Sequence, residues 1–242
     1  MYNFLRLLAG LAVLGLVALL AIIFVPVQRS APTASLPEGW TPDPGAPQYA
    51  ARMADCAACH TAEGGKPFAG GKAIESPMGA IYASNITPDP KTGIGDWSLD
   101  DFRAALVDGV TPQGTHLYPA MPYENYRHLS EQDIRALYAY FMQDVTPVKN
   151  DVTRTALSFP FNQRWGLKLW RAAFMAPVEM SPILGQTENW NRGQKLAQGA
   201  AHCAAYHTGR NILGGLKASE AFSGNDKLPG GSSAPSIRAS DL

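Results

Sequence analysis

The sequence predicts a mainly α-helical protein, with one N-terminal membrane helix followed by short helices and long loops. Three observations support this prediction. An uncharged apolar run opens the chain, short segments with helical spacing of apolar residues follow it, and 23 glycines and 19 prolines separate these segments. Apolar residues make up 46% of the 242 positions, which suffices for a packed core, and the formal net charge is zero. We expect no nucleic-acid partner, since such a partner requires a concentrated basic face.

The apolar run at residues 7–25 contains no charged residue and has the length, about 20 residues, that a helix needs to cross a bilayer. A cleaved signal peptide is the alternative, but its apolar region usually covers roughly 7–15 residues, and residues 31–35 form a poor cleavage site. We therefore expect residues 1–28 to be a membrane anchor or signal sequence, with an uncleaved anchor preferred. The rest of the chain is then on the periplasmic side of the cytoplasmic (inner) membrane, behind an extended tether at residues 29–46.

Helical spacing predicts three helices within a first domain at residues 47–148. The first starts at Pro47 and ends near Ala58, and the second runs from the N-cap residue Ser98 to Gly109. The third follows Ser130, and its apolar positions are Ile134, Leu137, Tyr138 and Phe141. The intervening residues 61–96 and 110–128 are expected to be mostly loops.

Residues 149–186 are predicted to be a connector. Within it, residues 159–176 mix Trp and Phe with Arg and Lys. We expect a helix or turn that packs against the neighbouring domain. The alternative is a docking surface for a partner subunit or for membrane lipid, where Trp and Arg are both favoured.

The segment Cys56-Ala57-Ala58-Cys59-His60 is a C-x-x-C-H sequence, the pattern of covalent haem c attachment. Two thiols on one helical turn can form thioethers with the two vinyl groups of a porphyrin, and the adjacent imidazole becomes the proximal ligand of the iron. A zinc site would need a second pair of ligands, for which the first domain offers only two further histidines. A thiol redox site would need a βαβ context, which is absent. We therefore predict a haem c held by Cys56, Cys59 and His60.

Electron-transfer haems commonly have methionine as the sixth ligand of the iron. Met121 lies between Pro119 and Pro122 in a rigid loop before the last helix of the first domain, and we predict that it is the distal ligand. Met78 and His116 are the alternatives, although Met78 is more simply explained as core filler and His116 as an exposed loop histidine. Methionine ligation would raise the reduction potential of the haem.

The start of the first domain recurs late in the chain. Residues 203–208 (CAAYHT) match residues 56–61 (CAACHT) at five of six positions. We expect residues 187–242 to be an incomplete second cytochrome c-like domain, with Cys203 and His207 at a second haem site. Tyr206 replaces the second cysteine, and a phenol cannot form a thioether. We interpret this second site as damaged, with a single thioether at Cys203 as its remaining means of attachment.

These segments resemble the cytochrome c subunits of membrane-bound, quinone-reducing dehydrogenases of acetic acid bacteria, which act on alcohols, aldehydes or gluconate. The resemblance is carried by the segments ADCAACHTAEGGKPFAGG, SNITPDPKTGIGDWSLDDF, LYPAMPY, LYAYFMQDV, FPFNQRWGLKLWRAAF and HCAAYHTGRNILGG. It implies class I-like cytochrome c domains and matches the first haem site at Cys56, Cys59, His60 and Met121. It also implies three such domains in one chain, so we expect a natural truncation, a partial or frameshifted sequence, or a variant with one intact haem.

The same resemblance implies an electron-transfer subunit that is not an enzyme by itself. Its partner would be the catalytic subunit of an aldehyde or alcohol dehydrogenase, bearing pyrroloquinoline quinone, flavin or a molybdenum cofactor, and ubiquinone would accept the electrons. A stand-alone, membrane-bound cytochrome c carrier with one haem is the alternative hypothesis. A third hypothesis is an inactive remnant in which only the anchor and the first domain fold.

Overall fold

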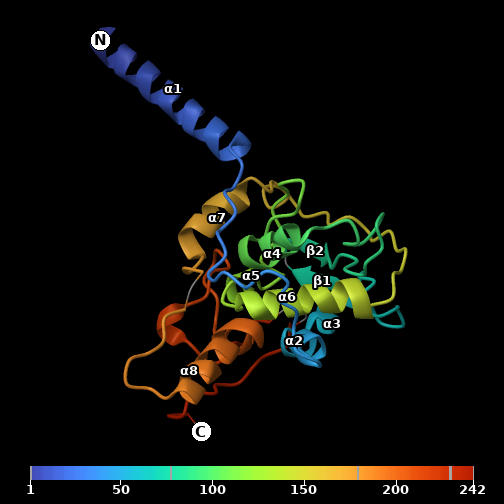
Figure 1. Cartoon of the computed structure of the whole chain (residues 1–242). Coiled ribbons are helices and arrows are strands. Elements are labelled where there is room, and N and C mark those ends of the chain that lie inside the picture. The colour runs from blue at the N-terminus through green and yellow to red at the C-terminus, as the bar shows by residue number, and fades with distance from the viewer. Residues whose placement is uncertain (1, 77, 179, 229–230, 242) are drawn as a thin grey trace.

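The computed structural model describes residues 2–76, 78–178, 180–228 and 231–241 (Figure 1). Its first helix, α1 (Tyr2–Phe24), projects away from the rest of the chain, and none of its residues is buried. Among the described residues, it is the one helix that is long and apolar enough to cross a membrane. The other elements are α2 (Ala46–Met53), α3 (Cys56–His60), β1 (Ala73–Ser76), β2 (Gly79–Tyr82), α4 (Leu99–Asp108), α5 (Tyr123–Tyr126), α6 (Glu131–Ala139), the π-helical turn η1 (Tyr140–Asp144), α7 (Gly166–Phe174), α8 (Glu188–Lys195), the π-helical turn η2 (Leu196–Ala200), α9 (Cys203–His207) and the 3₁₀ turn η3 (Ala218–Glu220).

The main core lies where α2, α4 and α6 pack together. Both predicted N-caps in this core are confirmed: the Ser98 hydroxyl accepts a hydrogen bond from the backbone N–H of Asp101, and Ser130 accepts one from Asp133. Each cap satisfies a backbone donor that the first helical turn leaves without a partner. The fold is thus the mainly helical one that the sequence predicts, with short helices joined by long loops.

Two local features differ from the sequence-based expectation. The helix predicted from Pro47 to Ala58 is interrupted, because Asp55 adopts a left-handed backbone conformation with φ of 47° between α2 and α3. The segment expected to be mostly loop contains an antiparallel hairpin, in which Ile74 of β1 lies opposite Ile81 of β2. Each strand has only four residues, so the alternating pattern of a strand is too short to stand out.

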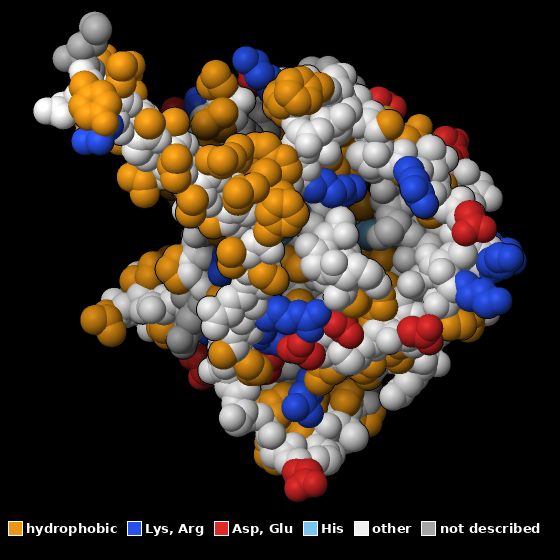
Figure 2. All heavy atoms as spheres, turned by 90° about the horizontal axis from the view of Figure 1, so that it is seen from above, with side chains coloured by type: hydrophobic (Ala, Val, Ile, Leu, Met, Phe, Trp, Pro, Cys, Tyr) orange, Lys and Arg blue, Asp and Glu red, His pale blue; other side chains and the backbone are white. Residues whose placement is uncertain are grey.

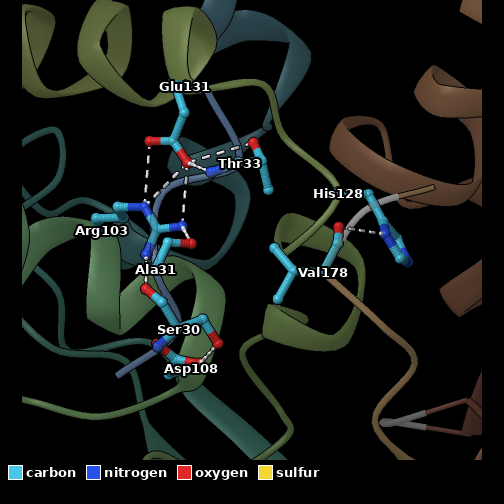
Figure 3. Close-up of polar contacts among 8 residues, drawn as sticks. All are labelled: Ser30, Ala31, Thr33, Arg103, Asp108, His128, Glu131 and Val178. Carbon is cyan, nitrogen blue, oxygen red and sulfur yellow. Dashed lines mark hydrogen bonds and ion pairs between the residues drawn. The ribbon is translucent and has the colours of Figure 1, made fainter. Parts of the chain in front are cut away.

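The start of the predicted tether is bound to the first domain (Figure 3). Arg103 on α4 forms a salt bridge of 3.0 Å with Glu131 on α6, and both side chains are buried. Arg103 also donates a hydrogen bond to the carbonyl oxygen of Ser30, whose own N–H donates to the Asp108 carboxylate at 2.9 Å. The backbone N–H of Thr33 donates to Glu131 at 3.0 Å. The chain leaving α1 is therefore fixed to two helices of the core.

Helix α7 lies beside the end of α1 (Figure 1). The Lys168 ammonium group donates to the carbonyl oxygen of Ile23 in the last turn of α1, at 3.2 Å, and to that of Val25 just after the helix. Another part of α7 faces the first domain. There the Trp170 ring packs edge-on against the Tyr123 ring, with the ring centroids 6.2 Å apart. The segment at residues 159–176 therefore contains a helix that packs against its neighbours, which was the preferred interpretation of its sequence.

The second unit, with α8, η2 and α9, packs against α5 of the first domain. Arg210 forms a salt bridge of 2.7 Å with Glu124, and the Asn125 side-chain amide donates to the carbonyl oxygen of Gln198 at 2.6 Å. Ala200 is 4% exposed and belongs to the same buried cluster as the core of the first domain. The two units consequently share one interface and part of one core.

Candidate haem site

A cavity of about 2380 Å³ opens beside α3. It is larger than the roughly 300–1,000 Å³ of an ordinary small-molecule pocket. Cys56, Cys59 and His60 line it, and so does Met121. Its apolar wall comprises Ile81, Ile86, Ile94, Trp97, Phe102, Leu106, Leu137 and Phe141. The structure thus brings all four residues predicted for the first site to one large, mainly apolar cavity.

Helix α3 places the two cysteines at this cavity. The break at Asp55 separates α3 from α2, and the Tyr126 hydroxyl donates to the carbonyl oxygen of Ala54 at 2.6 Å just before the break. The attachment motif therefore occupies a short helix of its own. A hydrogen bond from a buried tyrosine of the core fixes the chain just before this helix. Tyr126 was not among the residues that the motif indicated.

The thiols at the cavity are not activated nucleophiles. Burial raises the pKa of Cys56 to about 12, and burial also raises the pKa of Cys59. A reactive thiol in a disulfide oxidoreductase instead has a lowered pKa and a positive environment. Within the part of the chain that the structure describes, all three cysteines are free and no cluster of His, Cys, Asp and Glu is suited to a metal ion. Neither the thiol redox nor the zinc interpretation gains support from this arrangement.

The imidazole of His60 is oriented by a backbone carbonyl. Its Nδ1 lies 2.7 Å from the carbonyl oxygen of Ser84, which can only accept a hydrogen bond, so Nδ1 carries the proton. Burial lowers the pKa of His60, so the neutral ring is favoured. A neutral imidazole with a protonated Nδ1 leaves Nε2 free as a metal ligand. The role of Ser84 had no signal in the sequence, because it depends on a backbone atom.

Of the two alternatives for the sixth ligand, Met78 lies at the cavity and His116 does not. Met78 lines the cavity together with Met121, whereas His116 is 6% exposed and lies outside the cavity lining. The expectation that His116 is an exposed loop residue is therefore wrong. Burial, together with the positive charges of Arg171, Lys168 and Arg164, lowers its pKa to about 4. It is buried because its loop lies under the connector, a long-range contact that local sequence does not reveal.

The backbone around His207 repeats that around His60. The Nδ1 atom of His207 lies 2.8 Å from the carbonyl oxygen of Pro235, as His60 does from Ser84. The residue after each histidine pairs with a glycine, Thr61 with Gly70 and Thr208 with Gly224. A phenylalanine with positive φ then donates its N–H to the threonine hydroxyl in both units, Phe68 to Thr61 and Phe222 to Thr208. The duplication seen in the sequence therefore extends to three-dimensional structure.

The altered position in the repeat faces the first site. Tyr206 lines the large cavity, whereas Cys203 and His207 do not. Burial, with Cys59 and the carboxylate of Asp55 nearby, raises the pKa of Tyr206. The structure thus brings Cys56, Cys59, His60 and Met121 together, and it places the predicted second pair of residues elsewhere.

Comparison with known proteins identifies the first unit. Residues 44–143 match the family described as Cytochrome c. These residues form a cytochrome c domain. Such a domain carries haem c, and the thiol pair, the imidazole with free Nε2, the thioether and the apolar cavity fit that group.

The cytochrome c domain and the residues C-terminal to it resemble subunits of dehydrogenase complexes. The chain is 46% identical over 189 residues to the gluconate 2-dehydrogenase cytochrome c subunit of Pantoea cypripedii, covering 78% of the chain and 43% of the relative. It is 44% identical over 200 residues to the alcohol dehydrogenase (quinone) cytochrome c subunit of Gluconobacter oxydans, covering 79% and 41%. It is also 47% identical over 169 residues to the fructose dehydrogenase cytochrome subunit of Gluconobacter japonicus, covering 68% and 34%. The chain spans less than half the length of each of these relatives.

Proposed function

We propose that this chain is the electron-transfer subunit of a membrane-bound dehydrogenase. It receives electrons from a catalytic subunit that oxidises an aldehyde or alcohol, and it passes them towards ubiquinone. The observation that carries this proposal is the meeting of Cys56, Cys59, His60 and Met121 at one cavity, which the connector and the second unit also line. The similarity to cytochrome subunits of gluconate and alcohol dehydrogenases supports the choice of partner.

Each residue of the first site has a separate task in this proposal. Cys56 and Cys59 would hold haem c by thioethers, and His60 and Met121 would ligate its iron. The bound haem supplies one-electron redox chemistry. Ser84 fixes the tautomer and ring orientation of His60 through the Nδ1 hydrogen bond of 2.7 Å. The apolar wall excludes water from the ring, which together with methionine ligation favours a high reduction potential.

For the second unit, we propose weaker haem binding or none. Cys203 and His207 keep the backbone frame of the first site, but Tyr206 cannot form the second thioether. Intact mass of the protein, produced with a c-type maturation system, measures the number of covalent haems directly. One haem is expected from the first site, and two would mean that Cys203 alone attaches a second.

The location of the chain is inferred from α1 and the surface beside it. We propose that α1 spans the cytoplasmic membrane and that the haem domain lies on the periplasmic side against the lipid. Figure 2, viewed from the side of α1, shows hydrophobic side chains continuing from the anchor onto the adjoining surface. Phe159, Phe161 and Leu169 are 80%, 52% and 51% exposed in the segment that contains α7. Leu169 lies on α7 and the two phenylalanines precede it, and exposed apolar side chains beside the membrane exit are suited to the lipid interface.

Purification from the membrane separates the proposed subunit from a stand-alone carrier. A large dehydrogenase subunit should co-purify with the chain, and ferricyanide- or quinone-coupled turnover should be lost on deletion of its gene and restored by this chain. Purification of the haem protein alone, with unchanged dehydrogenase activity after deletion, would instead support the carrier with one haem. A chain that holds no covalent haem would support the inactive remnant.

Met121→Ala tests the assignment of the sixth ligand. We expect the variant to retain covalent haem but to lose the sulfur-to-iron charge-transfer band and to have a lower reduction potential, since the thioether that favours ferrous iron is gone. Met78→Ala is the matched control, because this methionine lines the same cavity, and it should keep the band. Loss of the band in the Met78 variant alone would transfer the role to Met78.

A further inference from the structure

The Met121 loop, residues 117–122, makes contacts with the connector on its outer side. On the N-terminal side of Met121, the Tyr118 hydroxyl donates to the carbonyl oxygen of Phe161 at 3.0 Å. The guanidinium of Arg164 lies over the Tyr118 ring, 4.4 Å from its centroid, and donates a hydrogen bond to the carbonyl oxygen of His116. A cation over an aromatic face and a hydrogen bond to a carbonyl both favour one position of the loop.

The loop is also held on the C-terminal side of Met121. Tyr123 is fully buried, and its ring lies between Trp170 of α7 and Gly109 at the end of α4. A Cβ atom at Gly109 would lie only 2.7 Å from the Tyr123 ring, so the glycine is what allows this close approach.

Backbone hydrogen bonds connect Tyr118 and Tyr123, the two residues that contact the connector, to Met121. The N–H of Met121 donates to the carbonyl oxygen of Tyr118 at 3.1 Å, and the N–H of Tyr123 donates to the carbonyl oxygen of Met121 at 2.8 Å. Displacement of Tyr118 or Tyr123 would therefore displace the residue between them.

The connector is itself fixed, so it can serve as a support. Arg171 forms a salt bridge of 3.6 Å with the buried Asp108 of α4. Lys168 is bound to carbonyl groups at the end of α1. The segment that holds the loop is consequently attached both to the core and to the end of the anchor helix.

We propose that residues 159–174 form a clamp on the Met121 loop, with Arg164 and Tyr118 as positioning residues for the Met121 thioether. The clamp keeps the sulfur at the haem cavity and resists its replacement by other ligands. This inference rests on the proposed role of Met121 as the distal ligand. It assigns to the connector a part in the chemistry of the first site, beyond joining two units.

Competition by imidazole for the ferric iron tests the clamp. Imidazole can bind only when the Met121 loop moves away, so its apparent affinity reports how firmly the loop is held. Titration of the full-length haem protein in detergent, followed by loss of the sulfur-to-iron band, gives this affinity. Arg164→Ala removes the cation–π contact and one hydrogen bond, and imidazole should bind about tenfold more tightly to it. Tyr118→Phe keeps the ring and loses only the hydroxyl contact, so a change of about fivefold is expected.

Two further variants control for charge and for geometry. Arg154→Ala makes the same charge change in the same connector, at an exposed side chain with no hydrogen bond or ion pair to any described residue, and it should match the wild type. Arg164→Lys keeps the charge without the planar guanidinium, and its affinity for imidazole should fall between those of the wild type and Arg164→Ala.

The outcomes distinguish failure of the clamp from failure of the ligand assignment. Wild-type imidazole affinity in Arg164→Ala and Tyr118→Phe, with Met121→Ala abolishing the band, would overturn the clamp and leave Met121 as ligand. An unchanged band in Met121→Ala would instead overturn the ligand assignment. If Arg164→Ala does not fold, the conservative Arg164→Lys and Tyr118→Phe variants decide the matter, and wild-type affinity in both would contradict the clamp.

Discussion

At the scale of single residues, the two C-x-x-C-H-like segments show how one substitution separates fold from attachment. His60 and His207 each place Nδ1 within 2.8 Å of a backbone carbonyl, and the turns after them have the same hydrogen bonds. The backbone frame therefore does not depend on the second cysteine. What Tyr206 removes is a thiol, and with it one covalent bond to the cofactor.

Tyr206→Cys should restore attachment at the second site. We expect the number of covalent haems, measured by intact mass, to rise from one to two, because the variant recreates both thiols next to a histidine that is already oriented. Tyr206→Phe is the matched control, since it removes the hydroxyl without adding a thiol, and it should keep one haem. An unchanged count in the cysteine variant would show that the second unit lacks more than a thiol.

At the scale of elements, the sequence predicted most helices and missed those features that depend on distant contacts. The helix starts at Ser98 and Ser130 follow from local capping chemistry, so local sequence was sufficient for them. The break at Asp55 and the short β-hairpin lack a strong local signal. The attachment residues were evident from their spacing, whereas Ser84 and the burial of His116 arise from chain segments that meet only in the folded protein.

A buried ion pair between Arg103 and Glu131 contributes to the link between α4, α6 and the segment after the anchor. Arg103→Met should destabilise the protein by about 3–5 kcal/mol, because it leaves the Glu131 carboxylate buried without its partner. Denaturant unfolding of the full chain in detergent, followed by far-ultraviolet circular dichroism, measures this loss. The double variant Arg103→Met/Glu131→Leu removes both charges and should be more stable than the single one. Equal destabilisation in the two variants would contradict the explanation.

At the scale of the whole molecule, the described part of the second unit packs on the first domain and shares part of its core. The contacts between the units lie on α5, where Arg210 meets Glu124 and Asn125 meets the backbone of Gln198. Because α5 directly follows the Met121 loop, this interface also lies next to the first site.

This arrangement predicts that the two units unfold together. Peptides covering α4 to α6 and peptides covering α8 to α9 should lose their protection against hydrogen exchange at the same denaturant concentration, since η2 contributes Ala200 to the common core. Glu124→Ala should lower the midpoint of α8 to α9 more than that of α4 to α6, because it breaks the ion pair that lies between the units. Separate midpoints in the wild-type protein would mean that the second unit is held on the first only by its surface contacts, and that the site at His207 opens without disturbing the one at His60.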